Sequence, residues 1–154
     1  NLAGEGSIED HLLTLTTPEV LEIDERNIPT GKFLPVAGTP FDFLTETRLG
    51  DRLPSYDTGG LDHCFVLQRW RLLPFAKLVD PESGRSLSVV TSKPGVQIFT
   101  ANGFRGNPFP KWGGICFETQ NFPNAPNEPS FASSLIHPGD GYLHRTEFRF
   151  GLVD

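Results

Sequence analysis

Three neighbouring stretches indicate the fold class of this chain: Phe75-Ala-Lys-Leu-Val79, Asp80-Pro-Glu-Ser-Gly84 and Ser86-Leu-Ser-Val-Val-Thr91. Two largely apolar runs flank a segment rich in turn-forming residues, which is the pattern of a hairpin. In the second run apolar and polar residues alternate. Because successive side chains of a strand point to opposite faces, this alternation predicts a strand with one buried face.

Short runs of the same kind occur along the whole chain. They are His11–Thr17, Asp62–Leu67, Gly95–Thr100, Ile115–Gln120 and Tyr142–Phe150. No segment of about eleven residues keeps a helical period, although Thr45–Leu49 is a candidate for one short helical turn. Hairpin-like spacing of short strands is typical of antiparallel sandwiches and barrels. We therefore expect an all-β protein, an antiparallel β-sandwich forming a single domain over residues 1–154.

Composition narrows the classes of function. The chain has 154 residues, is 37% apolar, and contains 16 glycines and 14 prolines, which disfavours long helices. The net charge of −6 leaves no basic stripe for nucleic acid. The apolar runs are too short to cross a membrane as a helix. The sequence contains no methionine and begins at Asn1 within a stretch that we expect to be ordered, so we expect a processed or partial chain.

Cysteine and histidine spacings give no metal site or cofactor motif. Cys64 and Cys116 could form one disulfide, but their separation provides no disulfide framework, and we expect two free, buried thiols. Free thiols favour a reducing compartment, and hence the cytoplasm. The four histidines are scattered, and the sequence contains neither a glycine-rich phosphate loop nor a nucleophile elbow. We expect neither a metal nor an organic cofactor.

Strand alternation assigns Glu118 to a face. Within Ile115–Gln120, Glu118 shares one face with Cys116 and Gln120 and has no cation within two residues. One interpretation is a solvated outer face of a half-exposed sheet. The other is a carboxylate lining a cleft, where desolvation raises the pKa of the carboxyl toward the range that suits a general base.

Gln97 and Asp62 leave the same two alternatives open. Gln97 shares its face with Phe99, so it is either a surface amide or a group that binds sugar hydroxyls beside an aromatic ring. Asp62 follows a Gly-Gly pair at the start of a strand, where it is either a turn aspartate or a second carboxylate in the cleft. His63 points to the opposite face from Asp62 and is interpreted as structural.

The whole chain resembles the aldose 1-epimerase (galactose mutarotase) family. The matching stretches, in the order and at about the spacing of the family, are Asn1–Gly4, Ile8–His11, Ile28–Gly31, Gly38–Phe43, Leu61–Phe65, Ser83–Arg85, Pro94–Gln97, Cys116–Pro123 and Pro138-Gly139 ahead of Tyr142. Single pieces such as Ile-Pro-Thr-Gly are weak, but nine in order make a specific pattern.

The resemblance implies a fold, an activity and site residues. The family fold is a β-supersandwich about twice as long as this chain, with a monosaccharide bound in an open cleft. Its members interconvert the α and β anomers of aldoses such as galactose and glucose, without metal or organic cofactor. By motif, Glu118 matches the general base, Asp62 the aspartate that binds sugar hydroxyls, and Gln97 the glutamine near the sugar.

The resemblance also implies that part of the family site is not in this sequence. The family's acid histidine lies a few residues before the Asn-Leu-Ala-Gly stretch, and here that stretch begins at Asn1. We expect residues 1–154 to be the C-terminal part of a mutarotase, completed by an N-terminal segment or a partner chain. A sugar-binding module without turnover and a structural module that has lost the site remain as alternatives.

Overall fold

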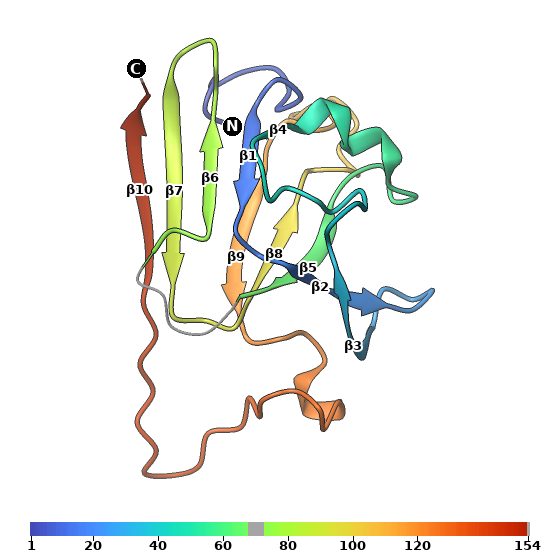
Figure 1. The fold of residues 1–154 in the computed structure, drawn as a ribbon, viewed down its shortest axis with the longest axis vertical. Coiled ribbons are helices and arrows are strands. Elements are labelled where there is room, and N and C mark those ends of the chain that lie inside the picture. The colour runs from blue at the N-terminus through green and yellow to red at the C-terminus, as the bar shows by residue number, and fades with distance from the viewer. Residues whose placement is uncertain (68–72, 154) are drawn as a thin grey trace.

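The computed structural model describes residues 1–67 and 73–153, and strands dominate it (Figure 1). The strands are β1 (Leu12–Leu15), β2 (Glu19–Ile23), β3 (Pro29–Pro35), β4 (Thr47–Arg48), β5 (Asp62–Val66), β6 (Ala76–Val79), β7 (Arg85–Thr91), β8 (Gly95–Phe99), β9 (Cys116–Gln120) and β10 (Thr146–Leu152). The helical elements in the described part of the chain are three short 3₁₀ turns, η1 (Leu49–Asp51), η2 (Leu53–Ser55) and η3 (Ala125–Asn127). The expected all-β class is confirmed.

The strands form two antiparallel sheets. One has the order β10-β7-β6-β1-β4 and the other β3-β2-β5-β8-β9. The hairpin predicted first is β6 and β7, in which Leu78 faces Leu87 and the Asp80 amide donates to the Arg85 carbonyl at 2.9 Å. The two sheets pack as a β-sandwich.

The core lies between the sheets and follows the alternation of the strands. Val96 and Ile98 of β8 and Phe65 of β5 are each 0% exposed, and Leu13 and Val89 of the facing sheet are equally buried. Burying a large apolar side chain contributes about 1.5–3 kcal/mol to the stability of the fold. These core positions therefore fix in place the strands that carry polar residues on their other face. A membrane-spanning helix is absent from residues 1–67 and 73–153.

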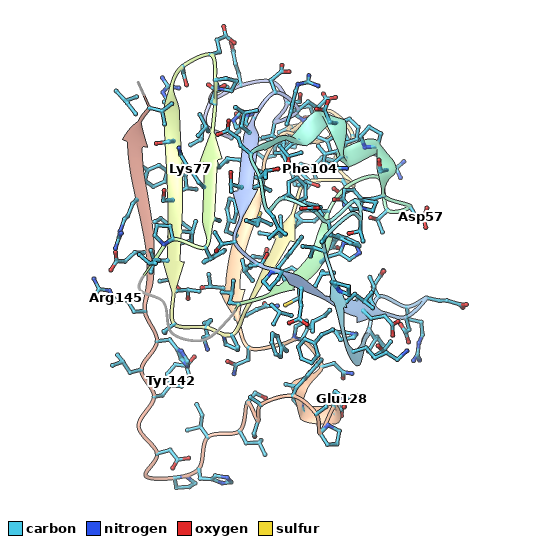
Figure 2. All side chains as sticks on the ribbon, in the orientation of Figure 1. Asp57, Lys77, Phe104, Glu128, Tyr142 and Arg145 are labelled. Carbon is cyan, nitrogen blue, oxygen red and sulfur yellow. The ribbon has the colours of Figure 1, made fainter. Side chains whose placement is uncertain are left out.

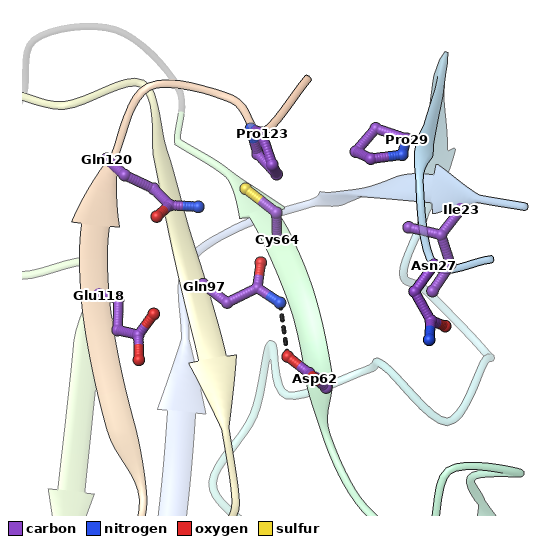
Figure 3. Close-up of a pocket in the computed structure, with 9 residues that line it drawn as sticks. All are labelled: Ile23, Asn27, Pro29, Asp62, Cys64, Gln97, Glu118, Gln120 and Pro123. Carbon is purple, nitrogen blue, oxygen red and sulfur yellow. Dashed lines mark hydrogen bonds between the residues drawn. The ribbon is translucent and has the colours of Figure 1, made fainter. Parts of the chain in front are cut away.

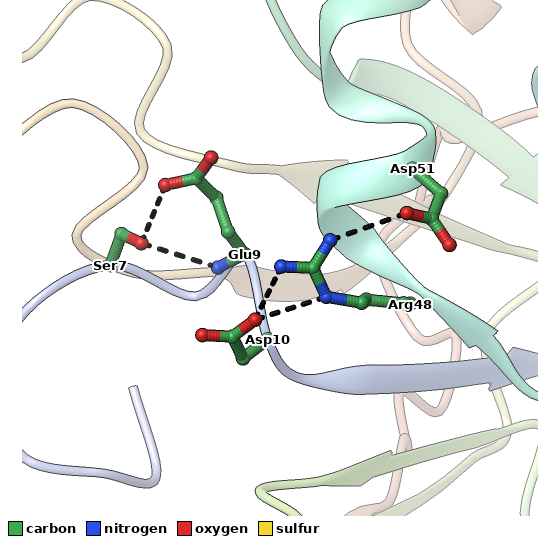
Figure 4. A network of polar contacts seen from close by, with 5 residues as sticks. All are labelled: Ser7, Glu9, Asp10, Arg48 and Asp51. Atoms are coloured by element: carbon green, nitrogen blue, oxygen red, sulfur yellow. Dashed lines mark hydrogen bonds and ion pairs between the residues drawn. The ribbon is translucent and has the colours of Figure 1, made fainter.

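The prediction of a helical turn at Thr45–Leu49 is wrong for most of that segment. Thr47 and Arg48 form β4, which pairs with β1, and η1 begins only at Leu49. Arg48 is held there by ion pairs: its Nε donates to Asp10 at 3.0 Å and its Nη1 to Asp51 at 3.2 Å (Figure 4). Because β4 pairs with β1, the exposed backbone edge of β1 gains a partner strand, which a local helical turn would not provide.

The last strand starts later than predicted. The sequence predicted a strand from Tyr142, but β10 begins at Thr146, opposite Thr91 at the end of β7. Within residues 1–67 and 73–153 no strand pairs with the chain just before Thr146, and the Tyr142 hydroxyl accepts a hydrogen bond from Lys93 Nζ at 3.0 Å. Tyr142 therefore lies on an extended segment that leads up to β10 (Figure 2).

Strand β10 presents apolar side chains to solvent. Phe148, Phe150 and Leu152 alternate along it and are 49%, 74% and 78% exposed. The strand pairs with β7 on one side and ends the sheet order on the other. An apolar edge strand of this kind is a surface on which another chain can pack.

Candidate functional site

The three site residues predicted from the sequence lie on adjacent strands of the second sheet. Asp62 starts β5, Gln97 lies in the middle of β8 and Glu118 in the middle of β9. The register places Gln97 directly opposite Glu118, and Cys64 of β5 opposite Gln97. Facing residues in antiparallel strands point to the same side of the sheet, so all three side chains project from the face away from the core.

These side chains share one cavity of about 310 Å³ (Figure 3). Its floor consists of polar and small residues from β5, β8 and β9, and its walls come from the β2–β3 hairpin and the segment after β9. The lining residues are Ile23, Asn27, Pro29, Asp62, Cys64, Gln97, Glu118, Gln120 and Pro123. The volume falls at the small end of the range found for ligand pockets, ~300–1,000 Å³, as a monosaccharide-sized ligand requires.

One hydrogen bond orders the floor of the cavity. Gln97 Nε2 donates to Asp62 Oδ1 at 2.7 Å. This contact fixes which end of the amide faces Asp62 and leaves Gln97 Oε1 and the second Asp62 oxygen as acceptors (Figure 3). Glu118 lies on the other side of Gln97, so two carboxylates flank one amide. Such a row of acceptors suits a ligand with several hydroxyl groups.

The position of Glu118 combines a part of each interpretation. Its side chain is exposed, as on a solvated outer face, and it also lines the cavity. The floor of the cavity is the outer face of the sandwich. Solvent reaches the Glu118 carboxylate, so the burial that the cleft interpretation expected is not found at this residue.

His63 points away from the cavity, as strand alternation predicted. Its ring lies 4.6 Å from the ring of Phe41 and 6.1 Å from that of Tyr56, measured between centroids. Burial lowers the pKa of His63 below its ordinary value. Its Nδ1 accepts a hydrogen bond from the Asp62 amide at 3.2 Å, so His63 also supports the start of the strand that carries Asp62.

The cysteine prediction holds in part. Both thiols are free, as expected, but only Cys64 is buried, and Cys116 is exposed. Cys116 faces Phe99 at the outer end of β9, where solvent reaches the strand. Burial raises the pKa of the Cys64 thiol to about 12, so this cavity-lining sulfur stays protonated near neutral pH.

Sequence reasoning missed the walls of the cavity. Asn27, at the tip of the β2–β3 hairpin, and Pro123, after β9, were not predicted to line the site. A signal for the hairpin was present in Asp24-Glu-Arg-Asn27, because aspartate and asparagine favour turns between strands. Nothing in strand alternation indicates that this turn stands over β5.

The family model for aldose 1-epimerase matches residues 1–149. The chain belongs to the aldose 1-epimerase family. Among curated relatives of this family, galactose mutarotase from Rattus norvegicus is 43% identical over 99% of the chain and 48% of its own length. The aldose 1-epimerase of Escherichia coli is 30% identical, over 97% of the chain and 48% of its own length.

Solved structures of the aldose 1-epimerase family share the fold. A GalM/aldose epimerase homologue from C. elegans superimposes with a TM-score of 0.89 at 25% identity, covering 100% of the chain and 49% of that structure. Galactose 1-epimerase from Lactobacillus acidophilus gives a TM-score of 0.77 at 29% identity, over 97% of the chain and 46% of its own. The chain thus spans about half the length of the family members it matches.

Proposed function

We propose that the protein containing this chain is an aldose 1-epimerase that interconverts the α and β anomers of hexoses such as galactose and glucose. Residues 1–154 would be the C-terminal part of its sandwich. The observation that supports this most directly is the cavity in which Asp62, Gln97 and Glu118 meet. The family resemblance implies a role for each of these residues, and they come from three different strands.

In the proposed reaction Glu118 is the general base. Its carboxylate takes the proton from the anomeric hydroxyl while the ring oxygen receives a proton from an acid, and the C1–O5 bond breaks to give the open-chain aldehyde. Rotation about C1–C2 and the reverse steps on the other face of the carbonyl give the second anomer. Asp62 and the amide of Gln97 hold ring hydroxyls meanwhile.

The acid is the component that this chain is proposed to receive from elsewhere. By the family resemblance we expect the acid histidine before Asn1, on an N-terminal segment or a partner chain. A positioned acid or base contributes ~10²–10⁴-fold, so residues 1–154 alone should retain little turnover. The reaction as written requires no metal or organic cofactor, and the free thiols favour a cytoplasmic setting.

The test is polarimetry with freshly dissolved α-galactose, on the protein expressed with any sequence its gene places before Asn1. Glu118→Gln keeps the shape of the side chain and removes the base, and we expect a ~10²–10⁴-fold lower kcat. Glu82→Gln, in the exposed turn after β6, is the matched control and should retain the wild-type rate. Equal rates for Glu118→Gln and wild type would refute the role given to Glu118.

A second candidate is a sugar-binding module that does not turn over its ligand. The exposure of Glu118 favours it, because solvent reaches the carboxylate that turnover would require as the base. This candidate predicts saturable binding of galactose or glucose without acceleration of mutarotation, and weaker binding in Asp62→Ala. If neither sugar binds, only a structural role for the sandwich remains.

A further inference from the structure

Three of the stretches that carry the family resemblance have no part in the proposed reaction, and they meet at one end of the sandwich. They are Asn1–Gly4, Ile8–His11 and Ser83–Arg85. The first residues of the chain lie there beside the start of β1 and the turn between β6 and β7 (Figure 1). His11 directly precedes β1, and Arg85 is the first residue of β7.

Both polar groups of the Leu2 backbone are bound by side chains from the other two stretches. The Leu2 amide donates to His11 Nε2 at 3.1 Å, and the Leu2 carbonyl accepts from Arg85 Nη1 at 2.9 Å. The Leu2 side chain packs against the core of the sandwich. His11 and Arg85 thus form a clamp on Leu2, and the backbone next to this residue is held at a defined place.

The buried imidazole of His11 is not explained by stability alone. The side chain is 1% exposed, and within the described part of the chain its Nδ1 has no hydrogen-bond partner. A buried polar atom without a partner costs ~1–3 kcal/mol, which an apolar ring of the same shape would avoid. The contact that the ring does make is the one from the Leu2 amide. Burial lowers the pKa of His11, which favours the neutral ring that can accept this hydrogen bond.

The clamped stretch lies against the segment that leads into β9, the strand of Glu118. Asn1 Nδ2 donates to the Gly113 carbonyl at 3.2 Å, and the Ile8 amide donates to the Trp112 carbonyl at 2.8 Å. Gly113 precedes Glu118 by five residues, which span at most ~18 Å at ~3.6 Å per residue. A segment of similar length in front of Asn1 is therefore long enough to bring a side chain to Glu118.

We propose that His11 and Arg85 are positioning residues for the acid of the proposed reaction. By holding Leu2, they fix the point at which the chain before Asn1 enters the site. This inference rests on the proposed function, which expects the acid in that part of the protein. Neither positioning residue lines the cavity of Glu118, and the groups proposed to bind sugar hydroxyls stand on β5 and β8. Loosening the clamp should therefore lower kcat and leave KM unchanged.

Polarimetry with α-galactose tests the inference on the protein expressed with any sequence its gene places before Asn1. His11→Phe keeps a ring of similar shape and removes the acceptor, whereas His11→Gln restores an acceptor near the position of Nε2. Because displacing a catalytic group by about 1 Å can cost ~10²-fold in rate, we expect kcat to fall ~10–100-fold in His11→Phe. His11→Gln should recover part of this loss, with KM unchanged in both variants.

Arg85→Met tests the same role at an exposed position, where the substitution leaves the core intact. We expect a similar fall in kcat, and partial recovery in Arg85→Lys, which keeps a donor for the Leu2 carbonyl. Arg149→Met is the matched control, because Arg149 lies on the neighbouring strand β10 and pairs with Glu147. It should keep the wild-type kcat, and its urea midpoint should equal that of Arg85→Met.

Two measurements separate positioning from a loss of folded protein. The pH profile of kcat reports the acid and the base, so in His11→Phe the limb set by the acid should move while the limb set by Glu118 stays. Hydrogen exchange reports local opening, and the Leu2 amide should exchange ~10-fold faster or more in His11→Phe and in Arg85→Met than in wild type.

The inference and the proposed function fail in different ways. Wild-type kcat in both His11→Phe and Arg85→Met, beside an impaired Glu118→Gln, would overturn the positioning role and leave the proposed function standing. A fall in kcat with an unchanged pH profile would also overturn it. If wild-type protein does not turn over galactose, the proposed function fails. Equal exchange of the Leu2 amide in wild type and both variants would then refute the clamp too, whereas faster exchange in both would support it.

Discussion

Gly60 links the stability of the sandwich to the position of Asp62. It is buried two residues before Asp62 and has φ of +154°, which side chains other than hydrogen rarely allow. A Cβ at this position would lie 2.1 Å from Asn102 Oδ1 and 2.6 Å from Thr100 Oγ1. Gly60→Ala therefore forces both a strained backbone and a displaced Asn102 side chain.

The expected loss follows from the contacts around Asn102. Its Oδ1 accepts from Thr100 Oγ1 at 2.6 Å, and its Nδ2 donates to the Leu61 carbonyl at 3.0 Å. Losing two hydrogen bonds of ~1 kcal/mol each, added to backbone strain of ~1–3 kcal/mol, lowers the free energy of unfolding by about 3–5 kcal/mol. This is a large share of the ~5–15 kcal/mol that stabilises a typical domain.

Urea unfolding followed by tryptophan fluorescence measures the effect. With an m-value of ~1–3 kcal/mol/M, the midpoint should fall by about 2 M. Gly141→Ala is the matched control, because a Cβ there meets no atom within 4 Å. In Gly60→Ala/Asn102→Ala the clash with Asn102 is gone, whereas the contact with Thr100 Oγ1 and the backbone strain remain, so the double variant should lose less than the two single variants added together. A Gly60→Ala midpoint equal to that of Gly141→Ala would refute the reasoning.

Three further predictions follow from burial and exposure. Burial lowers the pKa of His11 and of His63 below their ordinary value of 6.5, so these histidines bind protons more readily in the unfolded chain than in the folded chain. The free energy of unfolding should therefore fall as the pH drops through 6.5, and it should fall less steeply in His63→Gln. A thiol reagent should modify Cys116 in the folded protein and Cys64 only after unfolding, as mass spectrometry would show; early labelling of Cys64 would contradict its burial. Residues 1–154 expressed alone should self-associate through the apolar side chains of β10, and Phe150→Lys should reduce the association in sedimentation experiments, whereas a sharp wild-type monomer would count against it.

Much of the fold was predictable because buried faces leave a regular trace. β8 and β9 alternate between the core and the cavity, and Val96, Ile98 and Phe117 are at most 8% exposed. By contrast, β2 and β3 were not among the predicted strands. Phe33 and Leu34 are neighbours in sequence with 38% and 37% exposure, so neither face of β3 is fully buried and its alternation is weak. An edge strand with two half-exposed faces gives little signal.

The candidate site was predictable only in part, for a different reason. Alternation shows that Gln97 and Glu118 both point away from the core, but not that they face each other, since register depends on how β8 and β9 are joined. Their assignment to one site came from the family resemblance. The structure supplies the register of the strands and the hydrogen bond from Gln97 to Asp62, and no local sequence pattern predicts either of them.

The walls of the cavity are the part of the site that distinguishes it from an ordinary sheet surface. Any exposed sheet face tolerates polar residues, so Glu118 and Gln97 alone do not define a ligand. Asn27 and Pro123 enclose the space above them, and neither contributes to the sandwich core. Substitutions of Asn27 should therefore change ligand preference while leaving the stability of the sandwich nearly intact, whereas changes at core positions such as Ile98 should do the reverse.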